Sequence, residues 1–176
     1  MVELGFFRLN PDVIIPSYAT QHSCCFDLRY CPTNLVVTGY DSNNQPFQRY
    51  IDDEDKSFHV NPGDRTLVPT GLVFRIQTGF FSVSGEEYSI RLHPRSGLSL
   101  KKGLVLANAE GLIDYDYQKE IFVLLTNISN LTHRVEYQER ICQAEVVKTS
   151  KPAFVELVTH PDDVADRSGG FGSTGR

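Results

Sequence analysis

Short apolar runs, each broken by Gly, Pro or a polar turn, follow one another through the first 150 residues of the chain. Residues 24–30 (CCFDLRY) alternate, which puts Asp27 on one face of a strand and Phe26 on the other. Further strands are predicted over residues 66–76 (in two pieces), 80–92 and 134–147. No amphipathic helical stretch exceeds a turn or two, and the best candidate is residues 99–102. This pattern predicts an all-β sandwich or barrel.

Residues 104–120 carry the most unusual combination of side chains. An apolar run at 104–106 and a second at 120–125 are joined by a polar segment with Gly, which predicts a β-hairpin. The expected tip gathers an amide, two carboxylates and two phenol rings, from Asn108, Asp114, Asp116, Tyr115 and Tyr117. Such groups on one rigid bend could bind a base and a sugar and activate water.

Residues 39–57 are polar, rich in turn residues and acidic toward their end. They predict an exposed inserted loop or hairpin where a short connection would serve. An idle surface loop is the simpler interpretation, and a binding site for a protein partner is the alternative.

The periodic pattern stops near residue 160, and residues 161–176 are rich in Gly. This composition predicts a flexible C-terminal arm with no core of its own. A solvated terminus is the plain interpretation. The lone Phe171 among glycines, hydroxyls and two arginines indicates another, in which backbone N–H groups fold over a phosphate and the ring lies on a base.

Composition limits the class of protein and its partners. With 176 residues, 40% of them hydrophobic, the chain predicts one β domain over residues 1–160. The net charge of −5 gives no general attraction to nucleic acid. No apolar run is long enough to cross a membrane and no signal peptide is visible, so we expect a cytosolic protein, with a nuclear or organellar location left open. Four cysteines without zinc-ligand spacing predict reduced, mostly buried thiols.

Three polar features have the chemistry of a phosphate or metal site. Arg95-Ser96-Gly97 follows a predicted strand and bends sharply, which offers a guanidinium, a hydroxyl and free amides to a phosphate. Gln143 lies inside an apolar strand, where it could satisfy neighbouring backbone or donate to a phosphate oxygen. Asp27 is open to two interpretations, a satisfied polar group or an outer-shell partner of a metal ion.

Five segments, taken in order, resemble the five motifs of the trimeric dUTPases, the deoxyuridine triphosphate nucleotidohydrolases. They are CCFDL at 24–28, PRSGLSLKKGL at 94–104, LANAEGLIDYDY at 106–117, ERICQ at 139–143 and RSGGFGSTG at 167–175. The resemblance spans nearly the whole chain. Five ordered motifs are far less likely to arise by chance than by common descent.

The resemblance implies a jelly-roll-like β-clip subunit that assembles as a homotrimer, with active sites shared between subunits. It implies Mg²⁺-dependent hydrolysis of dUTP to dUMP and pyrophosphate, which limits uracil incorporation into DNA and supplies dUMP for dTTP synthesis. The implied location is the cytoplasm, or the host cell cytoplasm if the chain is viral. No direct contact with nucleic acid is implied.

The resemblance also implies roles for individual residues. Asp114 matches the carboxylate that activates water against the α-phosphorus, Arg95 assists it, and Asp27 reaches the Mg²⁺ through water. Tyr117 matches the ring under the deoxyribose, where a ribose 2′-hydroxyl would clash. The implied substrate-binding set is Ser96, Gly97, Asn108, Gly111, Ile113, Tyr117 and Gln143, with Arg167, Phe171, Gly172, Ser173 and Thr174 from the closing arm.

Two other functions stay open from the sequence. A related dCTP deaminase would share the fold and the trimer but would use a glutamate for amine chemistry, for which Glu110 is the nearby candidate. A nucleotide-sensing regulator would bind dUTP and then a protein partner, through residues 39–57, and would not require the loss of catalysis.

Overall fold

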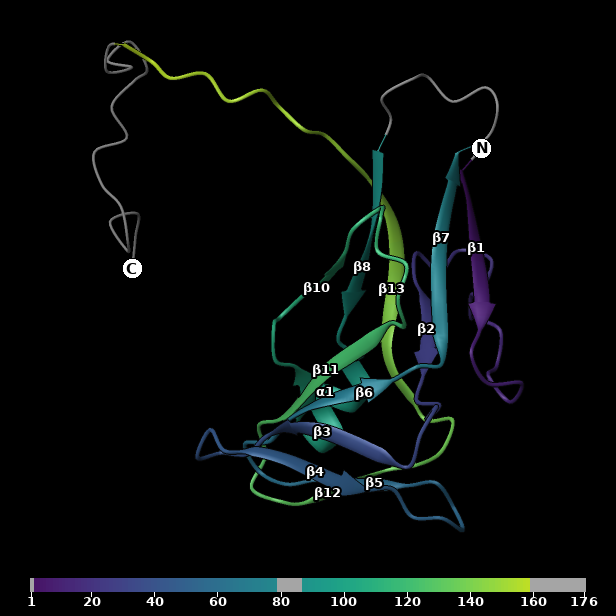
Figure 1. The fold of residues 1–176 in the computed structure, drawn as a ribbon, viewed down its shortest axis with the longest axis vertical. Coiled ribbons are helices and arrows are strands. Elements are labelled where there is room, and N and C mark those ends of the chain that lie inside the picture. The colour runs from purple at the N-terminus through teal and green to yellow at the C-terminus, as the bar shows by residue number, and fades with distance from the viewer. Residues whose placement is uncertain (1, 79–86, 159–176) are drawn as a thin grey trace.

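The computed structural model describes residues 2–78 and 87–158, which form a β-rich body with one short helix, α1 (Ser96–Lys102) (Figure 1). A four-stranded sheet has the order β10 (Gly111–Ile113), β8 (Glu87–His93), β13 (Arg140–Thr149) and β2 (Phe26–Arg29). A five-stranded sheet has the order β4 (Pro46–Tyr50), β3 (Val36–Tyr40), β6 (Arg65–Pro69), β11 (Phe122–Asn127) and β9 (Leu104–Leu106). Two antiparallel pairs complete the fold, β1 (Val2–Arg8) with β7 (Leu72–Thr78) and β12 (His133–Val135) with β5 (Phe58–Val60). The prediction of a mostly β chain with a single short helical candidate is confirmed.

Both larger sheets contribute to one buried apolar cluster. Along β11, Val123 and Leu125 are fully buried and Phe122 is exposed, as the two-residue period of a strand requires. On β2 the same period buries Phe26 and leaves Asp27 half-buried, which confirms the predicted alternation. Each fully buried aliphatic side chain contributes roughly 1.5–3 kcal/mol, so this cluster fixes the sheets that carry the polar residues.

The hairpin predicted over residues 104–120 is correct in pairing the two apolar runs and wrong in the segment that connects them. β9 pairs with β11, with Leu106 opposite Leu125, so the two apolar runs do lie antiparallel. Between them, however, β10 pairs with β8 in the other sheet, with Gly111 opposite Leu92. A Cβ at Gly111 would lie 3.0 Å from the Cβ of Leu92, so a larger residue here would press against that side chain. The segment from β9 to β11 therefore crosses between the two sheets. The spacing of apolar residues along the chain does not indicate which sheet a strand joins.

Residues 39–57 contain the turn and second strand of the β3–β4 hairpin, and β4 is an edge of the five-stranded sheet. The carboxylate of Asp41 accepts the N–H groups of Asn43 and Gln45, each at 2.8 Å, which orders the turn. In the acidic loop after β4, Asp55 pairs with Arg134. A protein partner for this region stays a prediction.

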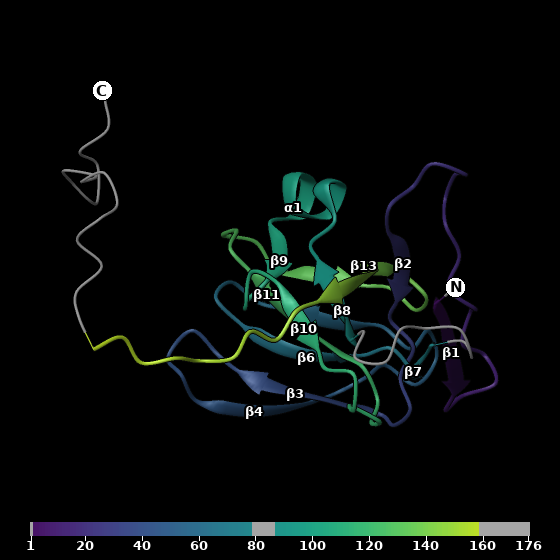
Figure 2. The same ribbon diagram turned by 90° about the horizontal axis from the view of Figure 1, so that it is seen from above.

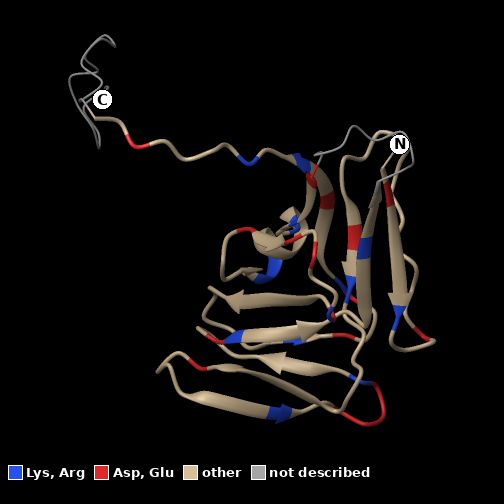
Figure 3. Ribbon diagram, turned by 45° about the horizontal axis from the view of Figure 1, so that its top comes forward, with Lys and Arg blue, Asp and Glu red and all other residues tan. Residues whose placement is uncertain are grey.

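Charge and cysteine chemistry are unremarkable across the described residues. Figure 3 shows basic and acidic positions interspersed along the chain, with no broad region of one sign in the part that is coloured. All four cysteines are free, with Cys31 and Cys142 buried, Cys25 half-buried and Cys24 exposed. Within residues 2–78 and 87–158, no helix is long and apolar enough to cross a membrane.

Residues 151–158 leave the body after β13 as an extended segment (Figure 1). Phe154 is 99% and Val158 is 100% exposed, although both are apolar. An extended apolar segment without a covering surface in its own subunit is typical of a contact with another chain.

Candidate active site

A cavity of about 330 Å³ lies where β2, β13 and the start of α1 meet. Its lining residues come from three of the sequence motifs and from the loop before β2: Ala19, Ser23, Cys24, Cys25, Asp27, Arg95, Ser96, Gly97, Arg140 and Gln143. Five of the predicted site residues are therefore brought together here, from positions more than a hundred residues apart. In Figure 2, α1 lies on the opposite side of the body from β3 and β4, which places this cavity away from the polar 39–57 region.

Asp27 joins two guanidinium groups in this cavity. Its Oδ1 accepts the Nε–H of Arg95 at 2.8 Å, and its Oδ2 accepts an N–H of Arg140 at 3.1 Å. Asp27 and Arg95 have side chains that are 20% and 24% exposed, whereas Arg140 is 45% exposed at the rim. The charged side chains that line the cavity are two guanidinium groups and one carboxylate, so their net charge is positive and suits an anionic ligand.

Arg140 is a site residue that the sequence analysis missed. Strand period would place it on the opposite face from Gln143. The register of β13 against β2 shifts between Arg140 and Cys142, however, and Ile141 and Cys142 are buried consecutively. This β-bulge turns the arginine toward Asp27. The available signal was its place in the ERICQ motif, not its spacing.

The turn before α1 is held by Gln143, whose Nε2 donates to the carbonyl of Pro94 at 3.0 Å. α1 then begins with Ser96 and Gly97, both exposed, while Leu98 is buried and anchors the helix. The first N–H groups of a helix have no intrahelical acceptor, and nothing lies within 4 Å of a Cβ built on Gly97. Leu98 and Ser99 donate their N–H groups to the carbonyl of Arg95, so the donors left for a ligand in the cavity are the Ser96 hydroxyl and the N–H groups of Ser96 and Gly97.

The Cys25 thiol in the same cavity is not suited to nucleophilic catalysis. Burial raises the pKa of Cys25, and the negative charges of Glu145 and Asp27 raise it further. A thiol that stays protonated at neutral pH is a poor nucleophile.

Of the remaining predicted residues, Asp114 lines a second cavity, of about 580 Å³, beside β10. Asp114 and Asp116 line it, together with Arg91 and Lys151, and both carboxylates are exposed. A hydrogen bond to Glu87 and the charge of that residue raise the pKa of Lys151, and Asp116 and Asp114 add to the rise, so the lysine stays cationic beside them.

Asn108, Ile113 and Tyr117 lie before and after Asp114 in the sequence but do not line this second cavity. Asn108 is exposed in the turn after β9, and its carbonyl accepts the N–H of Glu110 at 2.6 Å. Ile113 ends β10, and Tyr117 is 38% exposed with its hydroxyl bonded to the carbonyl of Glu120 at 3.1 Å. An exposed ring and free backbone edges on one loop suit the recognition of a flat, polar ligand.

One chain does not bring these two groups of residues together. Ile113 lies opposite Ile90, Ile90 opposite Val146, and Val146 is three residues along β13 from Gln143, which lies opposite Asp27. Three strand spacings and three residues put the end of β10 on the order of 17 Å from Asp27. Attack on a bound group requires reacting atoms about 3–3.5 Å apart, so the end of β10 and Asp27 are two separate places on one chain.

The metal-binding capacity of the described residues is small. In the ranges 2–78 and 87–158, no three His, Cys, Asp or Glu side chains lie where they could hold a metal ion. Asp27 is the carboxylate that lines the cavity beside α1, and its oxygens accept hydrogen bonds from two arginines. This arrangement fits an ion carried in by a triphosphate better than an ion caged by the protein.

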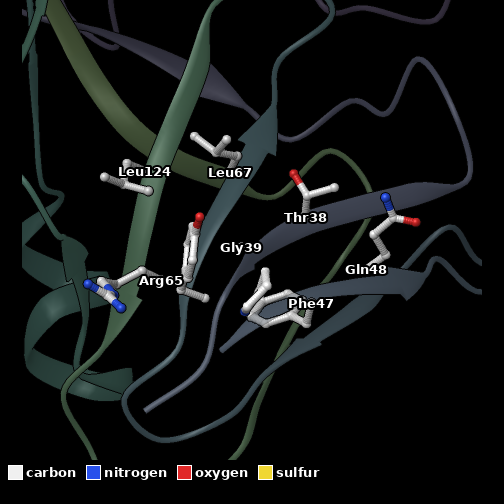
Figure 4. Close-up of a pocket in the computed structure, with 9 residues that line it drawn as sticks. Thr38, Gly39, Phe47, Gln48, Arg65, Leu67 and Leu124 are labelled. Carbon is white, nitrogen blue, oxygen red and sulfur yellow. The ribbon is translucent and has the colours of Figure 1, made fainter. Parts of the chain in front are cut away.

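A groove of about 560 Å³ on the outer face of the five-stranded sheet is a different kind of feature (Figure 4). It is mostly apolar, with Leu67, Leu124 and Phe47 among its lining residues, and Arg65 supplies its charge. None of the predicted site residues lines it.

The predicted arm residues Arg167, Phe171, Gly172, Ser173 and Thr174 lie outside the described residues. Their roles stay predictions.

Comparison with known proteins gives a consistent picture. A model of the dUTPase family matches residues 54–175. The chain is 34% identical to the deoxyuridine 5'-triphosphate nucleotidohydrolase of Nautilia profundicola over 99% of this chain and 100% of that one, and 35% identical to the protein of the same name from Hahella chejuensis over 96% and 91%. Among solved structures, the dUTPase of Staphylococcus bacteriophage 80alpha with dUPNHPP has a TM-score of 0.71 at 18% identity, covering 99% of both chains. The dUTPase of Streptococcus mutans has a TM-score of 0.56 at 24% identity, covering 85% of this chain and 99% of that one.

Proposed function

The chain belongs to the dUTPase family and is a deoxyuridine 5'-triphosphate nucleotidohydrolase, and from that premise we propose how its residues divide the hydrolysis of dUTP. The observation that carries the proposal is the cavity in which Asp27, Arg95, Ser96, Gly97 and Gln143 meet. We assign this cavity to the phosphate chain and the loop after β10 to the nucleoside and the attacking water.

At the phosphate chain, the Arg95 guanidinium and the Gln143 amide donate to phosphate oxygens, with the Ser96 hydroxyl and the Gly97 amide near the bridging oxygens. Charge that develops on the leaving pyrophosphate is stabilised by donors already in place before the reaction. Arg140 adds a second guanidinium, and its bond to Asp27 holds it at the rim until the nucleotide arrives.

At the nucleoside, the carboxylate of Asp114 orients and deprotonates the water that attacks the α-phosphorus in line. The ring of Tyr117 packs under the deoxyribose and leaves no room for a ribose 2′-hydroxyl. Asn108 and the backbone at Gly111 and Ile113 read the edge of uracil. The exposure of Asp114 and Tyr117 supports these roles, because both side chains are free to meet a ligand.

A Mg²⁺ ion, when bound with the nucleotide, would neutralise charge on the triphosphate. Asp27 is the residue that would reach it through water, and it would then give up part of its contact with the arginines. A related structure, of a phage phi11 dUTPase mutant from S. aureus, was described for the coordination of a structural Mg(II) ion.

We further propose a homotrimer in which Asp114 acts on a nucleotide whose phosphates occupy a neighbouring subunit's cavity. The separation of the two groups across β8 and β13 supports this, since the site is incomplete within one chain. The exposed apolar segment 151–158 supports it as well, because it extends away from the body of its own chain (Figure 1). Phe171 would then stack on uracil, while Arg167, Gly172, Ser173 and Thr174 close on the phosphates.

The position of Glu110, the candidate glutamate for a deaminase, argues against that alternative. Glu110 pairs with Arg91 at 3.4 Å and lines neither of the two cavities. The family match and the relatives are dUTPases. The sensing role stays a prediction, since nothing in the described residues identifies a protein partner.

The substrate assignment is tested by pyrophosphate release from dUTP, dCTP, dTTP and UTP in the presence of Mg²⁺. We expect kcat/KM for dUTP to exceed that for each of the others by about 10²-fold or more, because unpaired or clashing groups penalise the wrong base and sugar. Chelation with EDTA is expected to suppress release, and added Mg²⁺ to restore it. Equal rates on dUTP and UTP would contradict the role of Tyr117. Tight dUTP binding without turnover would contradict hydrolysis and favour the nucleotide-sensing alternative.

Arg140 is expected to bind phosphate rather than to act in chemistry. The Arg140→Ala variant should raise KM for dUTP by about tenfold, equivalent to about 1.4 kcal/mol, with kcat within about threefold, since a charge-assisted contact of this size is lost. Arg75→Ala, on the β1–β7 pair, is the control for the change in net charge and should leave KM unaltered. An unchanged KM in Arg140→Ala would show that its bond to Asp27 is only structural.

A further inference from the structure

Asp114 and Tyr117 lie on a loop that burial does not hold in place. Every residue from 114 to 119 is exposed, and the loop joins β10 of one sheet to β11 of the other. At the start of the loop, the chain is held by the pairing of β10 with β8, which involves only the three residues Gly111–Ile113. Exposed segments with few buried contacts open at low free-energy cost, so the position of this loop depends on what fastens its far end.

Glu120 fastens that end. Its Oε1 accepts the N–H of Gly71 at 2.9 Å, and its Oε2 accepts the hydroxyl of Thr33 at 3.2 Å. The carboxylate thus joins the loop to the turn between β6 and β7 and to the segment before β3. Burial raises the pKa of Glu120, while the two donors act in the opposite direction. Hydrogen bonds to a half-buried carboxylate are stronger than those in bulk water.

A series of hydrogen bonds connects the backbone of Glu120 to the side chain of Tyr117 and to the backbone of Asp114. The Tyr117 hydroxyl donates to the carbonyl of Glu120 at 3.1 Å, and the Tyr117 N–H donates to the carbonyl of Asp114 at 3.1 Å. Directly after the anchor, Ile121 donates its N–H to the carbonyl of Leu72 at 2.8 Å. The loop is therefore tied to the same turn by a side chain and by the backbone next to it.

Glu120 lines neither the cavity beside α1 nor the one beside β10, and both of its oxygens already have donors. It is therefore placed to orient other groups and not to touch the nucleotide. Resting on the proposed function, we propose that Glu120 is a positioning residue, whose carboxylate fixes the loop of Asp114 and Tyr117 against the β6–β7 turn and so sets the geometry of the attacking water and the sugar.

Replacement of the side chain separates this role from a general loss of structure. Glu120→Ala should lower kcat for dUTP by about 30-fold with KM within about threefold, because a misplacement of about 1 Å costs about 10² in rate while the phosphate contacts lie elsewhere. Glu120→Gln should stay within about threefold of the wild type in kcat. Its amide oxygen can accept from Gly71, and its NH₂ can donate to the hydroxyl of Thr33.

A readout that does not depend on activity is the exchange of backbone amides in the 114–121 peptide, followed by mass spectrometry. Exchange should be about tenfold faster in Glu120→Ala and unchanged in Glu120→Gln. Lys119→Ala, an exposed neighbour outside this hydrogen-bond series, is the matched control and should match the wild type in both assays. Thr33→Val removes one of the two donors to the carboxylate and should give an intermediate rate of exchange, which keeps the test decisive if Glu120→Ala does not fold.

The proposal is overturned if Glu120→Ala keeps both the wild-type kcat and the wild-type exchange. It is also overturned if Glu120→Gln is as impaired as Glu120→Ala, since the charge and not the hydrogen bonds would then matter. A wild-type protein that binds dUTP without hydrolysing it would refute the proposed function alone, because the exchange measurement would still report on the anchor.

Discussion

The Asp114→Asn variant is expected to hydrolyse dUTP with a kcat about 10³-fold below that of the wild type, with dUTP affinity within about threefold. Asparagine keeps the shape and the hydrogen-bonding oxygen of the side chain but cannot take a proton from water. Asp114 is exposed and its carboxylate makes no ion pair in the described residues, so its loss should not disturb the fold. Steady-state pyrophosphate release gives kcat, and calorimetry with a non-hydrolysable dUTP analogue gives the affinity.

Asp116→Asn is the matched control, because Asp116 lies on the same loop and lines the same cavity. It removes the same charge two residues away, and kcat should fall by no more than about threefold. If both variants lose activity equally, catalysis depends on the combined negative charge of the loop and not on proton transfer to one carboxylate. If Asp114→Asn remains active, the water is activated by another group and the assignment of Asp114 is wrong.

The sequence was most informative where function depends on residues in a fixed local order. Alternation placed Asp27 correctly on the polar face of β2. The turn at Arg95 and the strand position of Gln143 led to residues that meet in one cavity. In each case the position of the side chain is set by the strand or turn that contains it. Such elements can be recognised from the local sequence, by a two-residue alternation or by a Ser-Gly turn.

Features that depend on distant contacts were missed. The connection of the hairpin over residues 104–120 was wrong because β10 pairs with β8 of the other sheet, where Gly111 packs closely against Leu92. Arg140 was missed because a bulge in β13 reverses its face. Glu120 was seen only as the start of an apolar run, since its partners Gly71 and Thr33 lie far away in sequence. Register and pairing are non-local, so local pattern cannot specify them.

A mixture of two inactive variants, Arg95→Ala and Asp114→Asn, is expected to regain activity when their subunits exchange. Each variant alone should lose at least about 10² in kcat/KM, through the phosphate contact or the base. In a random one-to-one mixture, about a quarter of shared sites would combine an intact Asp114 from one chain with an intact Arg95 from another. Co-refolded and separately refolded samples, compared for pyrophosphate release at equal protein concentration, measure this recovery.

The matched control replaces the two single variants by wild type mixed one-to-one with the Arg95→Ala/Asp114→Asn double variant. A shared site predicts about a quarter of the activity of an all-wild-type sample, whereas a site within one chain predicts about half. The two mixtures should therefore give the same activity if subunits share sites, and very different activities if they do not. No recovery in the first mixture, together with half activity in the second, would mean that the two residues of one chain meet. The distance on the order of 17 Å across β8 and β13 would then have to close by a rearrangement of the loop after β10, and Glu120 would be the contact that has to break.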